Sequence, residues 1–119
     1  MTAVAVVVAG GIGAGVRFLA GSAIQERLRT ELPWGTAVVN TFGAFALGVV
    51  AGTGFDGLAT DAVVGLLAGF TTYSTWMIEC VHLWLEGGDG RRRSVVNLVG
   101  LLAAGVVAVA LGHLLGSVL

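Results

Sequence analysis

The sequence has little charge, one cysteine, one proline and no lysine. Of its 119 residues, six are arginine and seven are aspartate or glutamate, so that 11% of the chain is charged. Soluble domains carry about 25% charged residues. A chain with so few cations does not suit nucleic-acid binding, and 56% hydrophobic residues exclude a disordered chain. The single cysteine excludes an intramolecular disulfide and a cysteine-rich metal site. We therefore expect a small membrane protein without a soluble domain.

The apolar residues are gathered into four long runs. The runs cover approximately residues 3–24, 34–52, 62–85 and 95–118, and a helix that crosses a bilayer needs about 20 such residues. We predict an all-α membrane protein in which residues 1–119 form one domain of four transmembrane helices. The first run has no basic residue before it and contains Arg17, which argues against a cleaved signal peptide.

The arginines outside these runs are distributed on one side only. The polar connections 25–33 and 86–94 together carry five arginines, whereas the connection 53–61 and both termini carry none. Basic residues flanking transmembrane helices stay in the cytoplasm. We therefore expect a multi-pass protein of the cell membrane, the plasma or inner membrane, with both termini outside.

Glycine is abundant, at 20 residues. Transmembrane helices associate through close backbone contact, which small residues four positions apart permit. Each run contains one such glycine pair, and this predicts a tight bundle or an oligomer rather than four separate helices surrounded by lipid. The pairs are Gly11/Gly15, Gly48/Gly52, Gly65/Gly69 and Gly112/Gly116.

Polar side chains within an apolar run need a partner or a function. Arg17 could extend its side chain to the membrane interface, or it could attract anions toward a cavity. Asn97, near the end of a run, suits a hydrogen bond between helices. Asn40 lies about two turns inside its run and is the better candidate for lining a pathway.

The third run carries four hydroxyl residues within five positions, which a helix facing lipid does not need. These hydroxyls follow Gly69 and could satisfy carbonyls that are freed by a break in the helix. Tyr73 and Trp76 would share one face of the continuing helix, where electropositive ring edges could contact an anion or simply pack in the core. The hydroxyl residues are Thr71, Thr72, Ser74 and Thr75.

Catalytic chemistry is not expected from this sequence. Glu79 is the only carboxylate deep within an apolar run, and no nucleophile, base and orienting group can be assembled around it. Glu79 and His82 alone are too few for a metal centre, and Cys80 is expected to be a small core residue.

Four segments resemble, in order, the signatures of the Fluc (CrcB) fluoride channel family, and together they cover nearly the whole chain. The third is the most specific, because the family has a glycine followed by hydroxyl residues and two phenylalanines at this place. The segments are Gly10-Gly-Ile-Gly-Ala-Gly-Val-Arg17-Phe18, Pro33-x-Gly35-Thr36-x-x-x-Asn40-x-x-Gly43-Ala-Phe45-x-x-Gly48, Gly69-Phe-Thr71-Thr72-Tyr73-Ser74-Thr75-Trp76 with Glu79, and Asn97-x-x-Gly100.

The resemblance implies an antiparallel dimer of four-helix subunits in lipid, in which the third helix is broken. It implies passive fluoride export, which lowers cytoplasmic fluoride, and a structural Na⁺ at the dimer centre on the backbone carbonyls of Ala68 and Thr71. The fluoride pathway would be lined by Asn40, Tyr73, Ser74, Thr75 and Trp76, and Arg17, Thr72 and Glu79 also fall within the matching motifs.

This chain departs from the family pattern at several positions. Ala68 replaces a glycine, Tyr73 and Trp76 replace the two phenylalanines, and Leu101 and Gly105 stand where the fourth helix usually carries polar groups. The partner would be a related subunit or a second copy of this chain. The one-sided arginines predict a single orientation in the membrane, which favours a related subunit of opposite bias.

Two alternatives to a fluoride channel subunit follow from the same residues. One is a non-conducting structural partner in a membrane complex, which Leu101 and Gly105 favour. The other is a small multidrug-type transporter, which depends on a carboxylate in its first helix. This chain has no carboxylate before Glu26.

Overall fold

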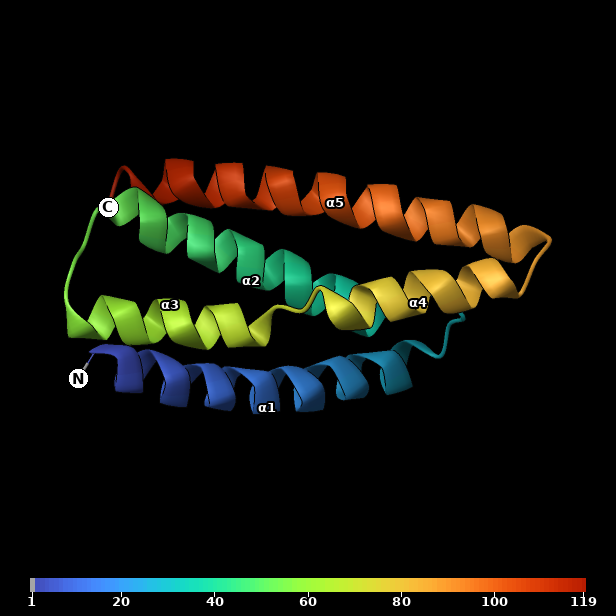
Figure 1. Ribbon diagram of the computed structural model, residues 1–119. Helices are drawn as coiled ribbons and strands as arrows, with labels where there is room; N and C mark the ends of the chain where they lie inside the picture. Colours follow the sequence, from blue (N-terminus) through green and yellow to red (C-terminus); the bar gives the residue numbers. More distant parts are fainter. Residues whose placement is uncertain (1) are drawn as a thin grey trace.

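The computed structural model describes residues 2–119, and within them all regular structure is helical. Five helices follow one another along the chain (Figure 1). They are α1 (Thr2–Leu28), α2 (Trp34–Thr53), α3 (Leu58–Phe70), α4 (Ser74–Leu85) and α5 (Asp89–Gly116).

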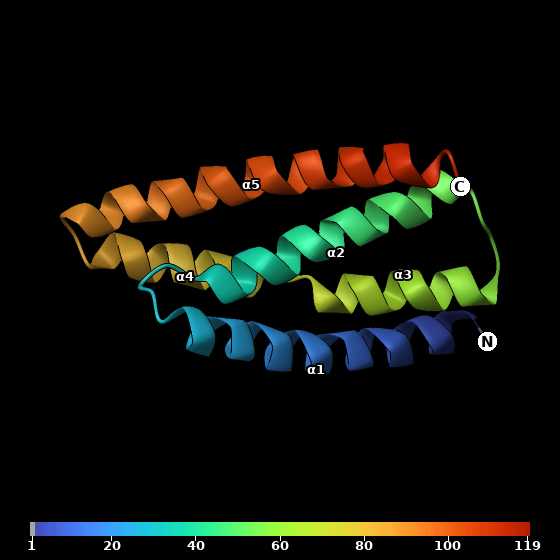
Figure 2. The same cartoon turned by 180° about the vertical axis from the view of Figure 1, so that it is seen from behind.

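Three of the four predicted spans correspond to one long helix each. α1, α2 and α5 are long and apolar enough to cross a membrane. The third predicted run is divided between α3, with 13 residues, and α4, with 12 residues. The two helices follow each other along the bundle in both views (Figures 1 and 2), with Thr71–Tyr73 between them.

The helix that contains the last predicted run, 95–118, begins six residues before that run. α5 begins at Asp89, so the connection after α4 contains only Glu86–Gly88. Gly87 and Gly88 have φ angles of 70° and 49°, which favour glycine and allow so short a turn. An acidic residue in the first turn of α5 suits the helix dipole, and the arginine run then lies on the helix. The first helix also continues further than predicted, to Leu28.

The helices pack as two pairs, with α1 against α3 and α2 against α5, while α4 continues beside α5. Both termini lie at one end of the bundle, and the α4–α5 turn lies at the other (Figures 1 and 2). The molecule measures 50 × 28 × 23 Å, and its length exceeds the roughly 30 Å hydrocarbon core of a bilayer. The five arginines of the connections 25–33 and 86–94 therefore lie at the end of the bundle opposite the termini, as predicted from their positions in the sequence.

Glycine backbones form the contact between α2 and α5, as predicted. A Cβ added at Gly48 would lie 2.3 Å from the Val109 carbonyl oxygen, and one added at Gly112 would lie 2.1 Å from the Phe45 carbonyl oxygen. No side chain fits in these contacts, so glycine is required for the two helices to approach this closely.

The contact between α1 and α3 also depends on glycine, but on α1 the glycines in this contact are not the predicted pair. Gly69 approaches the carbonyl of Gly10, and Gly13 approaches the carbonyl of Leu66. Gly11 and Gly15 have open space where a Cβ would lie. The helix therefore turns the neighbouring glycines toward its partner, which a four-residue spacing could not distinguish in so glycine-rich a segment.

Large apolar side chains cover the outside of the bundle instead of its centre. Phe18 is 70% exposed, Phe42 60% and Leu114 63%. Few apolar side chains are buried, because backbone contacts fill the interfaces between the helices. This distribution suits a surface in contact with lipid tails, which are as apolar as leucine.

Candidate functional site

Asn40 on α2 holds the segment that separates α3 from α4. Its amide nitrogen donates to the Thr72 carbonyl oxygen at 2.8 Å, and its amide oxygen accepts from the Thr72 backbone N–H at 2.8 Å. In a continuous helix these two backbone groups would bond within the helix. The side chain of Asn40 therefore replaces two helix hydrogen bonds, which allows the interruption inside an apolar bundle.

Thr72 and Thr75 continue this set of contacts toward α1. The Thr72 hydroxyl oxygen accepts from the Thr75 backbone N–H at 3.3 Å and lies 3.2 Å from the Thr75 hydroxyl. Arg17 donates from Nη1 to the Thr75 hydroxyl at 3.4 Å. A chain of polar groups thus crosses the bundle from Arg17 on α1 to Asn40 on α2. Of the two alternatives for Arg17, the structure favours the one in which it faces a cavity.

A polar cavity, here called the vestibule, lies among α1, α2 and α4 and has a volume of about 620 Å³. Its lining includes Arg17 and Glu79. The Nε atom of Arg17 and the Oε2 atom of Glu79 are buried and have no hydrogen-bond partner within residues 2–119. The other Glu79 oxygen accepts a hydrogen bond from the Thr36 hydroxyl. The vestibule is lined by Arg17, Phe18, Gly21, Ser22, Gln25, Glu26, Glu31, Pro33, Gly35, Thr36, Val39, Thr72, Thr75, Glu79, His82, Leu83 and Glu86.

A second cavity, here called the groove, lies among α2, α5 and the segment 71–76 and has a volume of about 530 Å³. Tyr73 and Trp76 lie in it edge to face, with ring centroids 6.0 Å apart and an interplanar angle of 85°. Tyr73 is 70% exposed. The groove is lined by Asn40, Ala44, Leu47, Thr71, Thr72, Tyr73, Trp76, Leu101, Leu102, Gly105, Val106 and Val109.

Thr72 lines both cavities. Asn40, which lines the groove, holds the Thr72 backbone in place. The polar groups of the groove come from α2 and from the segment 71–76. α5 contributes only apolar residues, among them Leu101 and Gly105.

Most of the predicted site residues gather around this junction, but two do not. Arg17, Thr75 and Glu79 line the vestibule, whereas Tyr73 and Trp76 line the groove. Ser74 and Ala68 are exposed and line neither cavity.

Asn97 connects two helices, as expected for a residue near the end of a run. Its amide donates to the Cys80 sulfur at 3.3 Å, and its backbone carbonyl accepts from Trp76 Nε1 at 3.3 Å. Cys80 is buried. Asn97 therefore joins α4 to α5 and lies outside both cavities that meet at Thr72.

The sequence reasoning missed Thr36 and Gln25. Thr36 is 8% exposed and contacts Glu79. Gln25 accepts from the Gly35 backbone N–H at 3.1 Å and donates to the Leu32 carbonyl at 3.0 Å, which closes the α1–α2 connection. A threonine within an apolar run was a visible signal for Thr36, but nothing in the sequence pairs it with a residue 43 positions away.

The carbonyls of Ala68 and Thr71 are free of helix hydrogen bonds. Within residues 2–119, no backbone N–H donates to either of them, and the Ala68 carbonyl accepts only from the Thr71 hydroxyl at 3.2 Å. Carbonyl oxygens are ligands for hard cations. Ala68 does not have a positive φ angle, so its methyl group is compatible with this backbone.

Comparison with known proteins gives a consistent result. The family described as CrcB-like protein, Camphor Resistance (CrcB), matches residues 4–113. A protein of Rubrobacter xylanophilus named fluoride-specific ion channel FluC 1 is 40% identical, over 92% of this chain and 88% of its own length. Fluoride-specific ion channel FluC 2 of Cutibacterium acnes is 37% identical over 98% of both chains. Fluoride-specific ion channel FluC 2 of Natronomonas pharaonis is 39% identical, over 100% of this chain and 97% of its own.

Proposed function

Because the chain belongs to the CrcB family, we propose that it is a subunit of a fluoride-selective channel, through which fluoride leaves the cytoplasm passively. Relatives that are similar over nearly their whole length carry the name fluoride-specific ion channel. The proposal therefore concerns the whole chain.

The observation that best supports a pathway through this subunit is that both cavities are lined by Thr72. The vestibule lies among α1, α2 and α4, the groove lies among α2, α5 and the segment 71–76, and both are lined by Thr72. A fluoride ion entering the vestibule would meet Arg17 and Thr75 before it reaches Asn40. Tyr73 and Trp76 would line the exit through the groove.

The donors along this route suit a small, strongly hydrated anion. The Asn40 amide group has two N–H bonds and uses one on the Thr72 carbonyl, so that one remains for fluoride. The hydroxyl of Thr75 and the ring edges of Tyr73 and Trp76 add weak contacts that replace water one at a time. Ser74 stays a prediction, since it lines neither cavity.

A Na⁺ ion would fit the carbonyls of Ala68 and Thr71. This chain supplies two such carbonyls without helix partners, and a partner subunit in the opposite orientation would supply two more. Bound there, Na⁺ would provide a fixed positive charge that joins the two subunits at the interrupted helices.

The partner subunit would pack on the face that carries Tyr73 and Ala68, both of which are exposed. We propose an antiparallel arrangement with the arginine-bearing end of this chain in the cytoplasm and both termini outside. Five arginines at one end and none at the other favour one fixed orientation, and hence a related partner of opposite orientation.

A second candidate function is a non-conducting half of such a dimer. The specific observation is the α5 side of the groove, where Leu101 and Gly105 offer no donor to an anion. In that case the conducting route would be formed with the polar residues of the partner subunit's fourth helix.

Growth of a fluoride-sensitive bacterial strain that lacks its own fluoride channels tests the proposal. Expression of this chain should restore growth in millimolar fluoride, alone or together with its partner subunit. Full expression in the membrane without any gain in fluoride resistance, alone and with a related subunit, would contradict it.

The fixed orientation has a separate test. A cysteine introduced at Arg92 in a Cys80→Ala background should resist a membrane-impermeant thiol reagent applied to intact cells. Labelling of half the molecules from outside would show dual orientation and contradict the heterodimer.

A further inference from the structure

The vestibule has the wrong sign of charge for an anion pathway. Its lining contains the carboxylates of Glu26, Glu31, Glu79 and Glu86 but only one arginine, Arg17. Like charges at the mouth of a pathway lower the local concentration of the permeating ion. An anion channel with such a vestibule needs positive charge from outside the cavity lining.

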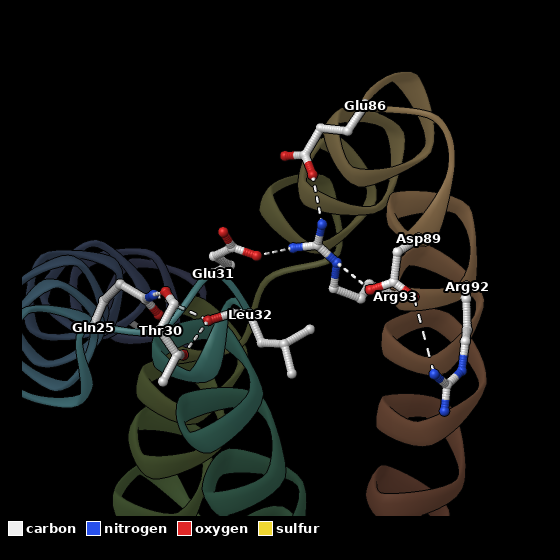
Figure 3. A network of polar contacts seen from close by, with 8 residues as sticks. All are labelled: Gln25, Thr30, Glu31, Leu32, Glu86, Asp89, Arg92 and Arg93. Carbon is white, nitrogen blue, oxygen red and sulfur yellow. Dashed lines mark hydrogen bonds and ion pairs between the residues drawn. The ribbon is translucent and has the colours of Figure 1, made fainter.

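Arg93 supplies that charge, since it contacts two of these carboxylates at once. Its Nη1 pairs with Glu31 in the α1–α2 connection, and its Nη2 lies 3.3 Å from a Glu86 oxygen at the end of α4 (Figure 3). Its Nε lies 3.4 Å from Asp89, one turn earlier on α5. The guanidinium thus lies among carboxylates from three parts of the chain.

Burial distinguishes Arg93 from an ordinary surface arginine. Its side chain is 23% exposed, whereas the side chains of Glu31, Glu86 and Asp89 are 83%, 53% and 69% exposed. The side chain of the neighbouring Arg92 is 82% exposed, and its one ion pair within residues 2–119 is with Asp89, at 3.9 Å. Arg93 is therefore fixed in position by its partners, and Arg92 is a matched control of equal charge.

We propose that Arg93 neutralises the carboxylates at the vestibule mouth and thereby determines how readily fluoride enters. This role rests on the proposed function. Arg93 lines neither cavity, so it acts on the ion through the carboxylates that it neutralises and holds in position. It also keeps Glu31 and Glu86 turned toward α5 (Figure 3).

The size of the effect follows from Coulomb attraction in water. One unit charge at about 8 Å from an entering anion changes the local anion concentration roughly two- to threefold at low ionic strength. The Debye length falls from about 30 Å at 0.01 M salt to about 3 Å at 1 M, which abolishes the effect. Ionic strength therefore separates an electrostatic role from a structural one.

The test is fluoride release from liposomes that contain the channel as it assembles, measured at about 0.01 M and about 1 M of an impermeant salt. Arg93→Gln should slow release roughly two- to threefold at low salt and leave it unchanged at high salt. Arg93→Lys should match the wild type, and the double variant Arg93→Gln/Glu31→Gln should restore the wild-type rate. Glu31→Gln alone should accelerate release at low salt.

The wild-type sample reports on the proposed function, and the variants report on Arg93. Fluoride release by the wild type with an equal rate for Arg93→Gln at low salt would overturn the inference. A loss of the same size at both salt concentrations, or a loss as large in Arg92→Gln, would also overturn it. Absence of release by the wild type would overturn the proposed function itself.

Discussion

Replacing Asn40 by alanine should stop most fluoride conduction, because one side chain both holds the interrupted segment and lines the groove of the proposed pathway. The substitution removes two hydrogen bonds of 2.8 Å to the backbone of Thr72. It also removes the amide N–H that remains available to an anion. The two losses act on different quantities, namely the stability of the fold and the rate of release.

The loss of stability can be bounded. Hydrogen bonds between transmembrane helices contribute about 0.6 kcal/mol each on average, which gives about 1 kcal/mol for the pair. If the Thr72 N–H and C=O remain without partners, each adds about 1–3 kcal/mol, so the total loss of stability is about 3–7 kcal/mol. For the ion, loss of a charge-assisted hydrogen bond worth about 1.5 kcal/mol lowers the rate about tenfold.

The assay is fluoride release from liposomes, followed with a fluoride-selective electrode, on protein whose helix content is checked by circular dichroism. Asn97→Ala is the matched control, because Asn97 also lies within a transmembrane helix but lines neither the vestibule nor the groove. It should stay close to the wild-type rate. A folded Asn40→Ala protein that releases fluoride within about twofold of the wild type would refute the reasoning, since the expected loss is tenfold.

Three further substitutions test the packing and the two cavities. Gly112→Ala places a Cβ 2.1 Å from a carbonyl oxygen of α2 and should lower the melting temperature in detergent, whereas Gly100→Ala meets nothing within 4 Å and should not. Equal melting temperatures would contradict the packing argument. Thr36→Val removes the hydroxyl that donates to Glu79 and should slow fluoride release, and Thr36→Ser should restore it; an unchanged rate in the valine variant would exclude this role. Trp76→Phe keeps a ring edge in the groove and should still conduct, while Trp76→Ala should lower the rate of fluoride release about tenfold. Equal rates in the two variants would show that the ring at position 76 has no role in conduction.

The long apolar runs were sufficient to predict α1, α2 and α5, because each of these helices is long and apolar enough to cross a bilayer. The hydroxyl-rich segment after Gly69 indicated where the third run is interrupted. The interruption covers Thr71–Tyr73 and depends on Asn40, which lies about thirty positions earlier in the chain. No local pattern in the sequence contains that pairing.

Side-chain direction limited the rest of the prediction. Gly10 and Gly13 rather than Gly11 and Gly15 face α3, because a glycine every two or three residues leaves the rotation of α1 undetermined. Arg93 could not be separated from Arg91 and Arg92 by sequence, since only the short turn at Gly87 and Gly88 brings it toward Glu31. The family resemblance supplied the candidate site residues, and the structure adds what these residues contact.

Simultaneous measurement of fluoride and chloride leaving the same liposomes tests the central claim most directly. The account predicts rapid release of fluoride and retention of chloride, by this chain alone or with the proposed partner subunit, and a marked loss of fluoride release in Asn40→Ala. Release of both anions at similar rates would contradict a fluoride-selective pathway. Retention of both anions, with the partner subunit present, would contradict conduction altogether.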